Sequence, residues 1–284
     1  MVTDAKPLIA GFQTCSLEFG GTRLRYAVGG AGPPLVLVHG LGGAASNWRA
    51  LAPALAARRR VVVPELPGHG GSLPMRGARD VDVFAEAMLA VAEAEGALPA
   101  PWVGHSLGGL VSIRAAVLRP EAVQGVVLAA GAGISSSARS AHVAVTMLGL
   151  VQPGRAIAPR RERVSRSRLG RRLAFGWWGA ADPAAMEPEV AESFLAGPAE
   201  HTDTVTAGRA LLDSDPREDL GRVSCSCLCL WGTNDNWVPL ADGIEYARRL
   251  RAPLRTIAGC GDLLIGERPD VCLRAIEGFL ASLG

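Results

Sequence analysis

Residues 100–118 read APWVGHSLGGLVSIRAAVL, and this stretch decides the fold that the sequence predicts. APWVGHS has the pattern of a buried strand, and LGGLVSIRAAVL has that of a helix. Between them, GHSLG at residues 104–108 matches G-x-S-x-G, which is a strong signal only where a strand precedes it and a helix follows. The flanking glycines allow a sharp turn and close packing of the helix. We therefore expect Ser106 to be exposed above the sheet as a candidate nucleophile.

The chain on either side of this stretch alternates between strand and helix patterns. SLEFGGTRLRYAVGG, residues 16–30, predicts a hairpin around its Gly-Gly pair. PPLVLVHG and RRVVVPELPGHG are apolar runs typical of buried parallel strands. Helical spacing occurs in SNWRALAPALAARR, with Ser46 as the expected cap, and from near Asp80 onward. This alternation predicts the α/β class: a doubly wound, mostly parallel, eight-stranded sheet with helices on both faces.

The alternation stops after residue 132. Residues 133–220 contain helical stretches but no convincing strand, and the strand and helix patterns resume at CSCLCLWG. We therefore expect a helical cap at 133–220, inserted between the sixth and seventh strands of the sheet. The α/β core would then consist of residues 1–132 and 221–284.

The bulk composition is that of a soluble globular protein. The 284 residues are 49% hydrophobic and 20% charged, which is enough apolar material for a substantial core. A net charge of +2 argues against a nucleic-acid-binding or membrane protein. The N-terminus lacks the pattern of a signal peptide, and no apolar run approaches the ~20 residues that span a bilayer. The expected location is the cytoplasm.

Cysteines alternate at Cys225, Cys227 and Cys229, so on a strand they would share one face. No second C-x-x-C and no histidine-rich partner completes a metal-binding pattern, so buried thiols are expected rather than a metal cluster. The other cysteines are scattered and predict no disulfide framework. We expect neither a metal nor a cofactor.

A glycine-rich loop, HGLGG at residues 39–43, follows the third predicted strand. The backbone N–H of Leu41 in this loop can point to the same place as the backbone N–H of Leu107. Two converging amides would form an oxyanion hole, worth ~3 kcal/mol per donor toward a tetrahedral intermediate. His39 is expected to be a structural hydrogen-bonding residue rather than a base.

These motifs together resemble the α/β-hydrolase fold family, specifically its esterase, lactonase and haloperoxidase-like branch with a helical cap. The similar stretches are LVLVHGLGG, VVPELPGHGGS, VGHSLGG, WGTNDNWVP and GERPD, which cover the whole core but not the cap. The resemblance implies that Ser106 is the nucleophile and that Asp235, after the seventh strand, is the acid that orients a histidine. Asp242 and Asp219 are substitutes for that acid, but neither lies in the matching loop.

The chain departs from the family pattern in IAGCGDLLIGERPD, residues 257–270. The resemblance implies a histidine in a G-H-x-x-x-x-E-x-P pattern, and Asp262 occupies its place. No histidine follows His201, so a shifted register cannot supply one. A carboxylate, with a reference pKa of ~3.9, is a much weaker base than imidazole at ~6.5. If Asp235 and Asp262 lie close together, their repulsion should raise one pKa and leave a shared proton.

Four readings of this substitution remain open. The leading one is a family enzyme acting at a carbonyl or acyl centre (ester, lactone or thioester) of an apolar small molecule, with hydrolysis impaired or replaced by lyase or cyclase chemistry. In the second, weak hydrolysis persists through water or a cap histidine, His142 or His201. A non-catalytic small-molecule-binding pseudoenzyme is the alternative class, and an engineered substitution is the fourth reading. Ala, Arg and Gly are abundant, which is typical of a GC-rich genome. Variant hydrolase folds from such genomes are associated with specialised metabolism, and we expect the same association here.

The cap carries an arginine-rich segment at 155–172 with a single acid, Glu162. It is either a solvated helical face or a docking surface for an acidic partner, such as an acyl carrier protein delivering a thioester. The run has no interleaved aromatics, which argues against nucleic-acid binding. Trp177 and Trp178 follow it and line either a substrate pocket or the core of the cap. The other candidate pocket residues are His39, His105 and Trp237.

Overall fold

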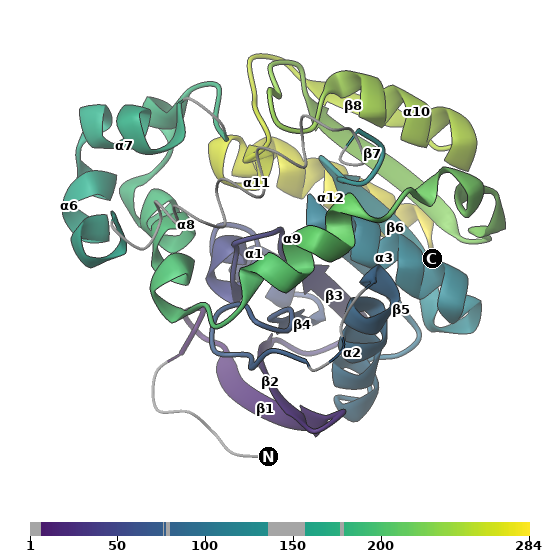
Figure 1. The fold of residues 1–284 in the computed structure, drawn as a ribbon. Coiled ribbons are helices and arrows are strands. Elements are labelled where there is room, and N and C mark those ends of the chain that lie inside the picture. The colour runs from purple at the N-terminus through teal and green to yellow at the C-terminus, as the bar shows by residue number, and fades with distance from the viewer. Residues whose placement is uncertain (1–6, 76, 78–79, 136–156, 177–178) are drawn as a thin grey trace.

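An eight-stranded sheet forms the centre of the molecule (Figure 1). The computed structural model describes residues 7–75, 77, 80–135, 157–176 and 179–284. The strands are β1 (Gln13–Phe19), β2 (Thr22–Gly29), β3 (Pro34–Val38), β4 (Arg60–Pro64), β5 (Ala100–His105), β6 (Val123–Ala129), β7 (Ser226–Gly232) and β8 (Leu254–Ile257). Their order across the sheet is β1-β2-β4-β3-β5-β6-β7-β8.

Most neighbouring strands run parallel. Only the β1–β2 and β2–β4 pairs are antiparallel. The β1–β2 hairpin turns at Gly20 and Gly21, whose φ values of 57° and 73° suit glycine. The predicted doubly wound, mostly parallel, eight-stranded sheet is therefore confirmed. The carboxyl ends of the parallel strands meet at one edge, where sheets of this kind bind their ligands.

Helices flank the sheet (Figure 1). They are α1 (Ala52–Ala56), α2 (Val81–Ala94), α3 (Leu107–Leu118), α10 (Leu240–Leu250), α11 (Leu264–Glu267) and α12 (Pro269–Ser282). The α2 helix begins where the sequence predicts, because the Asp80 side chain accepts a hydrogen bond from the Val83 N–H at 3.2 Å. Helix α3 starts directly after β5, so it fixes the residue between them at the ligand-binding edge.

The helix predicted over residues 46–59 is broken in the structure. It consists of a 3₁₀ turn, η1 (Ala45–Trp48), followed by the short helix α1. Asn47 Oδ1 accepts a backbone N–H from three residues earlier and closes the first turn, while Pro53 lies at the start of the second helix. Ser46 is not an N-cap, because its hydroxyl donates to a cap carbonyl instead. The predicted element type was right, but its extent and its cap were wrong.

Helices fill the described part of the chain between β6 and β7. They are η3 (Ala158–Arg160), α6 (Arg161–Arg166), α7 (Arg168–Phe175), η4 (Pro183–Ala185), α8 (Pro188–Glu200), α9 (Thr204–Leu212), η5 (Pro216–Glu218) and η6 (Leu220–Arg222). Ala207, Ala210 and Leu211 of α9 and Leu220 of η6 belong to the main core of the sheet. A separate small core joins α7 to α8 and is made of Ala174, Phe175, Ala180, Met186, Val190, Ala191, Leu195 and Leu263. The last of these comes from the loop after β8, so the cap shares its core with the segment around residue 262. The cap limits at 133 and 220 stay predictions.

The cysteines of β7 are buried in the sheet. Cys227 and Cys229 lie on the strand, and Cys225 is half-buried just before it. Within the described ranges, no group of three or more His, Cys, Asp or Glu side chains is arranged to hold a metal ion. Among the same residues, no helix has the length and apolar character needed to cross a membrane.

Candidate active site

Ser106 lies at the tight junction between β5 and α3. Its φ of 50° and ψ of −117° are rare for a residue with a side chain, so the surrounding structure must hold it there. Such a strained residue marks a site where geometry matters more than stability. Ser106 is only 6% exposed, so the prediction of an exposed serine was wrong. The neighbouring loop explains this, because a Cβ at Gly40 would lie 3.0 Å from Ser106 Cβ.

Two glycines make this junction possible. A Cβ at Gly104 would lie 2.2 Å from the Gly108 carbonyl oxygen, and a Cβ at Gly108 would lie 2.2 Å from the Val38 carbonyl oxygen. No real side chain fits at these distances, since the obstructing atoms are backbone. The start of α3 therefore packs directly on the end of β3, which brings the loop after β3 next to Ser106.

The predicted oxyanion donors lie on the two segments that meet at Ser106. Leu107 is the first residue of α3, a position whose N–H has no acceptor within the helix. Leu41 is half-exposed in the loop after β3. Neither amide has a hydrogen-bond acceptor among the described residues. Both are therefore available to a ligand, and their joint action as an oxyanion hole remains a prediction.

His39 lies behind this loop and does not line a pocket. It is fully buried, and burial lowers its pKa to about 3, so the ring is neutral. Its Nε2 accepts the Leu66 N–H at 3.1 Å, so the proton must be on Nδ1, which donates to the Gly40 carbonyl at 2.8 Å. Because a trans peptide is planar, this bond also orients the N–H of Leu41 away from His39.

Two buried carboxylates follow the ends of β7 and β8. Asp235 is 8% exposed, and its Oδ1 accepts the N–H groups of Trp237 and Val238, each at 2.8 Å. Asp262 is 3% exposed. Asp235 Oδ2 and Asp262 Oδ1 are buried, and neither has a hydrogen-bond partner in the described part of the chain. A buried oxygen without a partner is costly, so both atoms are available to a proton or a ligand.

His105, next to Ser106 in the chain, is the polar partner of Asp262. Its Nε2 donates to the Asp262 backbone carbonyl at 2.9 Å and lies 3.6 Å from Asp262 Oδ2. Burial lowers the pKa of His105, but the charge and hydrogen bonds of Asp262 outweigh it, so the pKa is raised. The sequence indicated His105 only as a candidate pocket residue. Its spacing from Asp262 gives no signal of the contact, because 157 residues separate the two.

The pKa of Asp235 is raised to about 8. Burial is the main cause and the charge of Asp262 is the second, while the hydrogen bonds from Val238 and Trp237 act in the opposite direction. Asp235 is therefore mostly protonated at neutral pH, and the site holds an exchangeable proton beside Asp262. This agrees in direction with the repulsion that the sequence suggested for the two carboxylates.

Glu267 fixes the loop that carries Asp262. It is 4% exposed, and its carboxylate accepts the N–H groups of Gly261 at 2.8 Å, Ala181 at 2.9 Å and Asp182 at 3.0 Å. Burial raises its pKa, and these three bonds oppose that rise. The bonds tie the loop after β8 to the cap. The sequence showed Glu267 only as part of the GERPD motif, without this role.

The remaining candidates lie elsewhere or outside the described residues. Asp242 accepts from the N–H and hydroxyl of Ser135, and Asp219 pairs with two arginines. Trp237 is half-buried against the main core. Among the described residues, no side chain makes a hydrogen bond to the Ser106 hydroxyl. His142, Trp177 and Trp178 fall outside the described residues.

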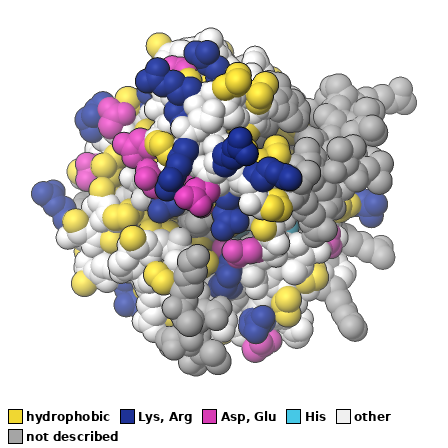
Figure 2. Space-filling view, turned by 90° about the vertical axis from the view of Figure 1, so that its left-hand side faces the viewer, with side chains coloured by type: hydrophobic (Ala, Val, Ile, Leu, Met, Phe, Trp, Pro, Cys, Tyr) yellow, Lys and Arg dark blue, Asp and Glu magenta, His cyan; other side chains and the backbone are white. Residues whose placement is uncertain are grey.

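The described part of the arginine-rich segment forms α6 and α7. Arg171 is buried and donates to backbone carbonyls within the cap, so it is structural. Figure 2 views this side and shows arginines interspersed with hydrophobic side chains. Leu169 and Leu173 of α7 are 65% and 69% exposed. A hollow of about 460 Å³ lies on this face, lined by Glu162, Arg163, Arg166 and Ser167.

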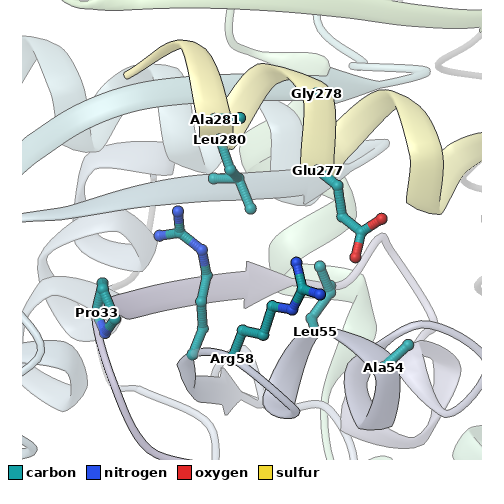
Figure 3. Close-up of a pocket in the computed structure, with 9 residues that line it drawn as sticks. Pro33, Ala54, Leu55, Arg58, Glu277, Gly278, Leu280 and Ala281 are labelled. Carbon is teal, nitrogen blue, oxygen red and sulfur yellow. The ribbon is translucent and has the colours of Figure 1, made fainter. Parts of the chain in front are cut away.

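A second hollow, of about 430 Å³, lies between α1 and α12, before the amino ends of β3 and β4. In Figure 3 the side chains of Glu277 and Leu280 point down from α12 toward Arg58 and Leu55 on the opposite side of the hollow. Its place at the opposite end of the strands from Ser106 separates it from the candidate active site.

Known relatives agree with the fold and with hydrolase-like chemistry. Residues 35–275 match the sequence profile of the Alpha/beta hydrolase family. A pimeloyl-[acyl-carrier protein] methyl ester esterase of Vibrio atlanticus is 33% identical over 230 residues, which cover 80% of this chain and 86% of the esterase. A dihydrolipoyllysine-residue acetyltransferase component of the acetoin cleaving system of Pseudomonas putida is 44% identical over 122 residues, which are 42% of this chain but only 33% of that protein.

Solved structures show the same architecture. The enol-lactonase from Burkholderia xenovorans superposes with a TM-score of 0.77 at 23% identity, over 94% of this chain and all of that chain (100%). A hydrolase from Pseudomonas aeruginosa gives a TM-score of 0.73 at 26% identity, over 94% of this chain and 98% of its own. With the profile match extending over most of the sequence, the chain belongs to the Alpha/beta hydrolase family.

Proposed function

We propose that this chain is an enzyme that binds an apolar carbonyl compound beside Ser106 and transfers a proton there, with acyl hydrolysis impaired or replaced. The reaction class is elimination or cyclisation, of the lyase or cyclase type, at an ester, lactone or thioester. The observation that carries the proposal is the pair Asp235 and Asp262, two buried carboxylates that each have an unpartnered oxygen.

In this proposal the carbonyl oxygen of the substrate is held by the amides of Leu41 and Leu107. Both amides are free of other acceptors among the described residues, and each such donor stabilises a developing oxyanion by about 3 kcal/mol. Asp262 takes a proton from the carbon next to the carbonyl, because its Oδ1 is buried without a hydrogen-bond partner among the described residues while its Oδ2 faces His105 at 3.6 Å. Asp235, protonated near pH 7, then supplies a proton to the departing or newly formed oxygen.

Hydrolysis through an acyl-enzyme is disfavoured because no base contacts Ser106 among the described residues. Its hydroxyl has no hydrogen-bond partner among the described residues. The two ring nitrogens of His201 are engaged by backbone groups, Nδ1 by Gly70 N–H at 3.0 Å and Nε2 by the Gly42 carbonyl at 2.8 Å. His201 is thus not positioned to act as a base for Ser106. An unactivated serine is a weak nucleophile, since general-base help contributes about 10²–10⁴-fold.

The experiment that tests this is labelling of Ser106 by a serine-directed fluorophosphonate, followed by intact mass. The wild-type chain, Asp262→His and the control Ser106→Ala are compared. We expect slow labelling of wild type and labelling of Asp262→His faster by about 10²-fold or more. Rapid labelling of wild type at Ser106 would favour acyl chemistry and contradict the proposal. Labelling of neither chain would show that Ser106 and its oxyanion donors are not arranged as proposed.

We propose an acyl carrier protein as a partner that docks on the arginines of α6 and α7. The 33% identical relative is named for an ester on an acyl carrier protein, and α6 and α7 of this chain present arginines to solvent. An acidic carrier protein would match that charge. Reversing the charge of Arg168 and Arg172, both exposed, should weaken its binding at least tenfold in a titration at low salt, and unchanged affinity would remove this partner.

A non-catalytic binding protein is the second candidate, favoured by the unpartnered Ser106 hydroxyl. It predicts that Ser106→Ala and Asp262→Asn both bind a hydrophobic carbonyl ligand with wild-type affinity and that no variant turns it over. Any turnover that Asp262→Asn abolishes would exclude this candidate.

A further inference from the structure

His201 ends α8 of the cap, and it contacts the loop that carries Leu41. We propose that His201 is a positioning residue, through which the cap holds the oxyanion loop (residues 40–43) in the geometry that directs the Leu41 amide at the substrate. This rests on the proposed function, because it assumes that the Leu41 amide serves a substrate oxyanion. It assigns His201 a role other than that of a base.

The tautomer of His201 follows from its two bonds. The Gly70 N–H donates to Nδ1 at 3.0 Å, so Nδ1 carries no proton. Nε2 therefore holds the proton and donates it to the Gly42 carbonyl at 2.8 Å. The neutral ring thus bridges two loops of the sheet domain, one after β3 and one after β4. Loss of the ring removes both bonds at once.

The bond to Gly42 acts on the Leu41 amide through a single turn. The Gly43 N–H donates to the Gly40 carbonyl at 3.0 Å, and the same carbonyl receives the Nδ1–H of His39. His39 therefore fixes the carbonyl of Gly40, directly before Leu41, and His201 fixes the carbonyl of Gly42, the residue after Leu41. Gly42 itself has a φ of 69° with no atom within 4 Å of a Cβ, so packing does not hold the turn on that side. The hydrogen bond from His201 supplies that restraint.

Neighbouring residues hold the ring of His201 in a defined position. Its ring meets that of His69 at 5.3 Å, and His69 in turn meets His39 at 5.3 Å, so three imidazoles connect the cap to the loop. A Cβ at Gly197 would lie 2.9 Å from His201 Cε1, so the helix leaves room for the ring only because that residue is glycine. The N–H groups of Thr202 and Asp203 both donate to the Gly68 carbonyl at 3.0 Å and anchor the chain beside it.

The consequence is that cap position and oxyanion geometry are coupled. If the cap shifts, the Gly42 carbonyl loses its donor and the turn gains freedom. If the cap is in place, the Leu41 N–H is held in one direction. Catalysis at Ser106 then depends on a residue that does not touch the substrate.

The first test is hydrogen exchange by mass spectrometry on peptides that cover residues 38–46. His201→Ala should raise exchange of the oxyanion loop at least tenfold, and His201→Gln should restore much of the protection, because its side-chain N–H₂ can still reach the Gly42 carbonyl. The matched control is Asp203→Ala, which removes the N-cap of α9 (its side chain bonds only Thr206) and leaves the loop bonds intact. Unchanged exchange in His201→Ala, or an equal rise in Asp203→Ala, overturns the inference.

The second test measures the rate of fluorophosphonate labelling in the Asp262→His background, with His201 kept or changed to Ala. We expect at least a tenfold fall in the maximal rate constant of labelling with the final extent of labelling unchanged, whereas a general loss of folding would lower that final extent. Looser exchange with an unchanged rate overturns the positioning role. If the Asp262→His chain is not labelled even with His201 intact, the proposed function fails instead, and the positioning role fails with it, while the exchange result still reports whether the contact holds the loop.

Discussion

The two halves of the candidate site differ in how they depart from the family pattern. The elbow half, made of β3, β5 and the start of α3, retains every feature that the pattern requires: a strained Ser106, flanking glycines and two amides without other acceptors among the described residues. The acid half, after β7 and β8, has the Asp235 loop, and Asp262 stands where the sequence resemblance leads us to expect a histidine. Backbone packing sets the geometry of the elbow half, whereas the chemistry of the acid half depends on its side chains.

That difference shows where chemistry can change without loss of the fold. A side chain cannot be added at Gly108 because backbone atoms fill the space. At residue 262, by contrast, the loop is held through its backbone, so a different side chain there should mainly change which protons the site holds. A substitution of the elbow should therefore act mainly on stability, and one of the acid half mainly on protonation.

The largest effect expected from breaking the elbow half is that of Gly108→Ala. The added methyl would lie 2.2 Å from the Val38 carbonyl oxygen, and overpacking against backbone should lower the free energy of unfolding by more than about 3 kcal/mol. Urea unfolding measures this. The control is Gly221→Ala, where no atom lies within 4 Å of the new Cβ and the change should stay under about 1 kcal/mol. Equal stability of the two variants would mean that the elbow is not tightly packed.

A smaller effect is expected from Glu267→Gln in the acid half. The amide group keeps the shape but turns one acceptor into a donor facing a backbone N–H, which should cost about 1–3 kcal/mol. The carboxylate now accepts from Gly261, Ala181 and Asp182, so the loop at residue 262 should also shift. Unfolding midpoints measure the stability, with the exposed Glu277→Gln of α12 as the control. A loss as small as in the control would mean that the buried carboxylate does not hold the loop.

The smallest expected effect, taken per pH unit, is a change in the free energy of unfolding with pH. The pKa of Asp235 is raised from 3.8 to about 8, so between these values the folded chain binds more protons than the unfolded chain. The free energy of unfolding should therefore fall as pH rises from 6 to 9, by at most about 1.4 kcal/mol per pH unit. The raised pKa of His105 acts in the same direction.

Asp235→Asn isolates the aspartate's share of that slope. The variant has no proton to lose at this position, so its stability should vary less across the same pH range, with the part due to His105 remaining. Denaturant titrations at pH 6, 7, 8 and 9 give both curves. A flat curve for the wild-type chain would show that the pKa of Asp235 is not raised in the folded state.

The sequence predicted local features well and contacts between distant segments poorly. The β1–β2 hairpin, the start of α2 at Asp80 and the strand–turn–helix around Ser106 depend on neighbouring residues, and the structure has them. The helix after residue 45 was predicted too long, because spacing alone does not show that Asn47 closes an early turn. The side chain of His105 meets Asp262 across 157 residues, and no periodicity reports such a contact.

The cap shows the same limit. The pattern of residues 133–220 indicates helices, but nothing in it shows that His201 contacts the loop after β3 or that Leu263 contributes to the cap's core. These contacts depend on how the insertion folds back onto the sheet. From sequence alone, His201 at the end of a cap helix is indistinguishable from a surface residue. Only the structure shows its bonds with the Gly70 N–H and the Gly42 carbonyl.

The loop after β8 has a consequence for how this site evolves. Apart from the 3.6 Å contact of Asp262 Oδ2 with His105, the bonds of this loop among the described residues involve its backbone: Glu267 accepts the Gly261 N–H, the Leu263 N–H donates to the Gly179 carbonyl, and His105 donates to the Asp262 carbonyl. The identity of the side chain at 262 is therefore a variable that natural selection can change in one step while the architecture persists. An acidic, basic or inert side chain at this position should therefore change the proton chemistry of the site on one and the same loop.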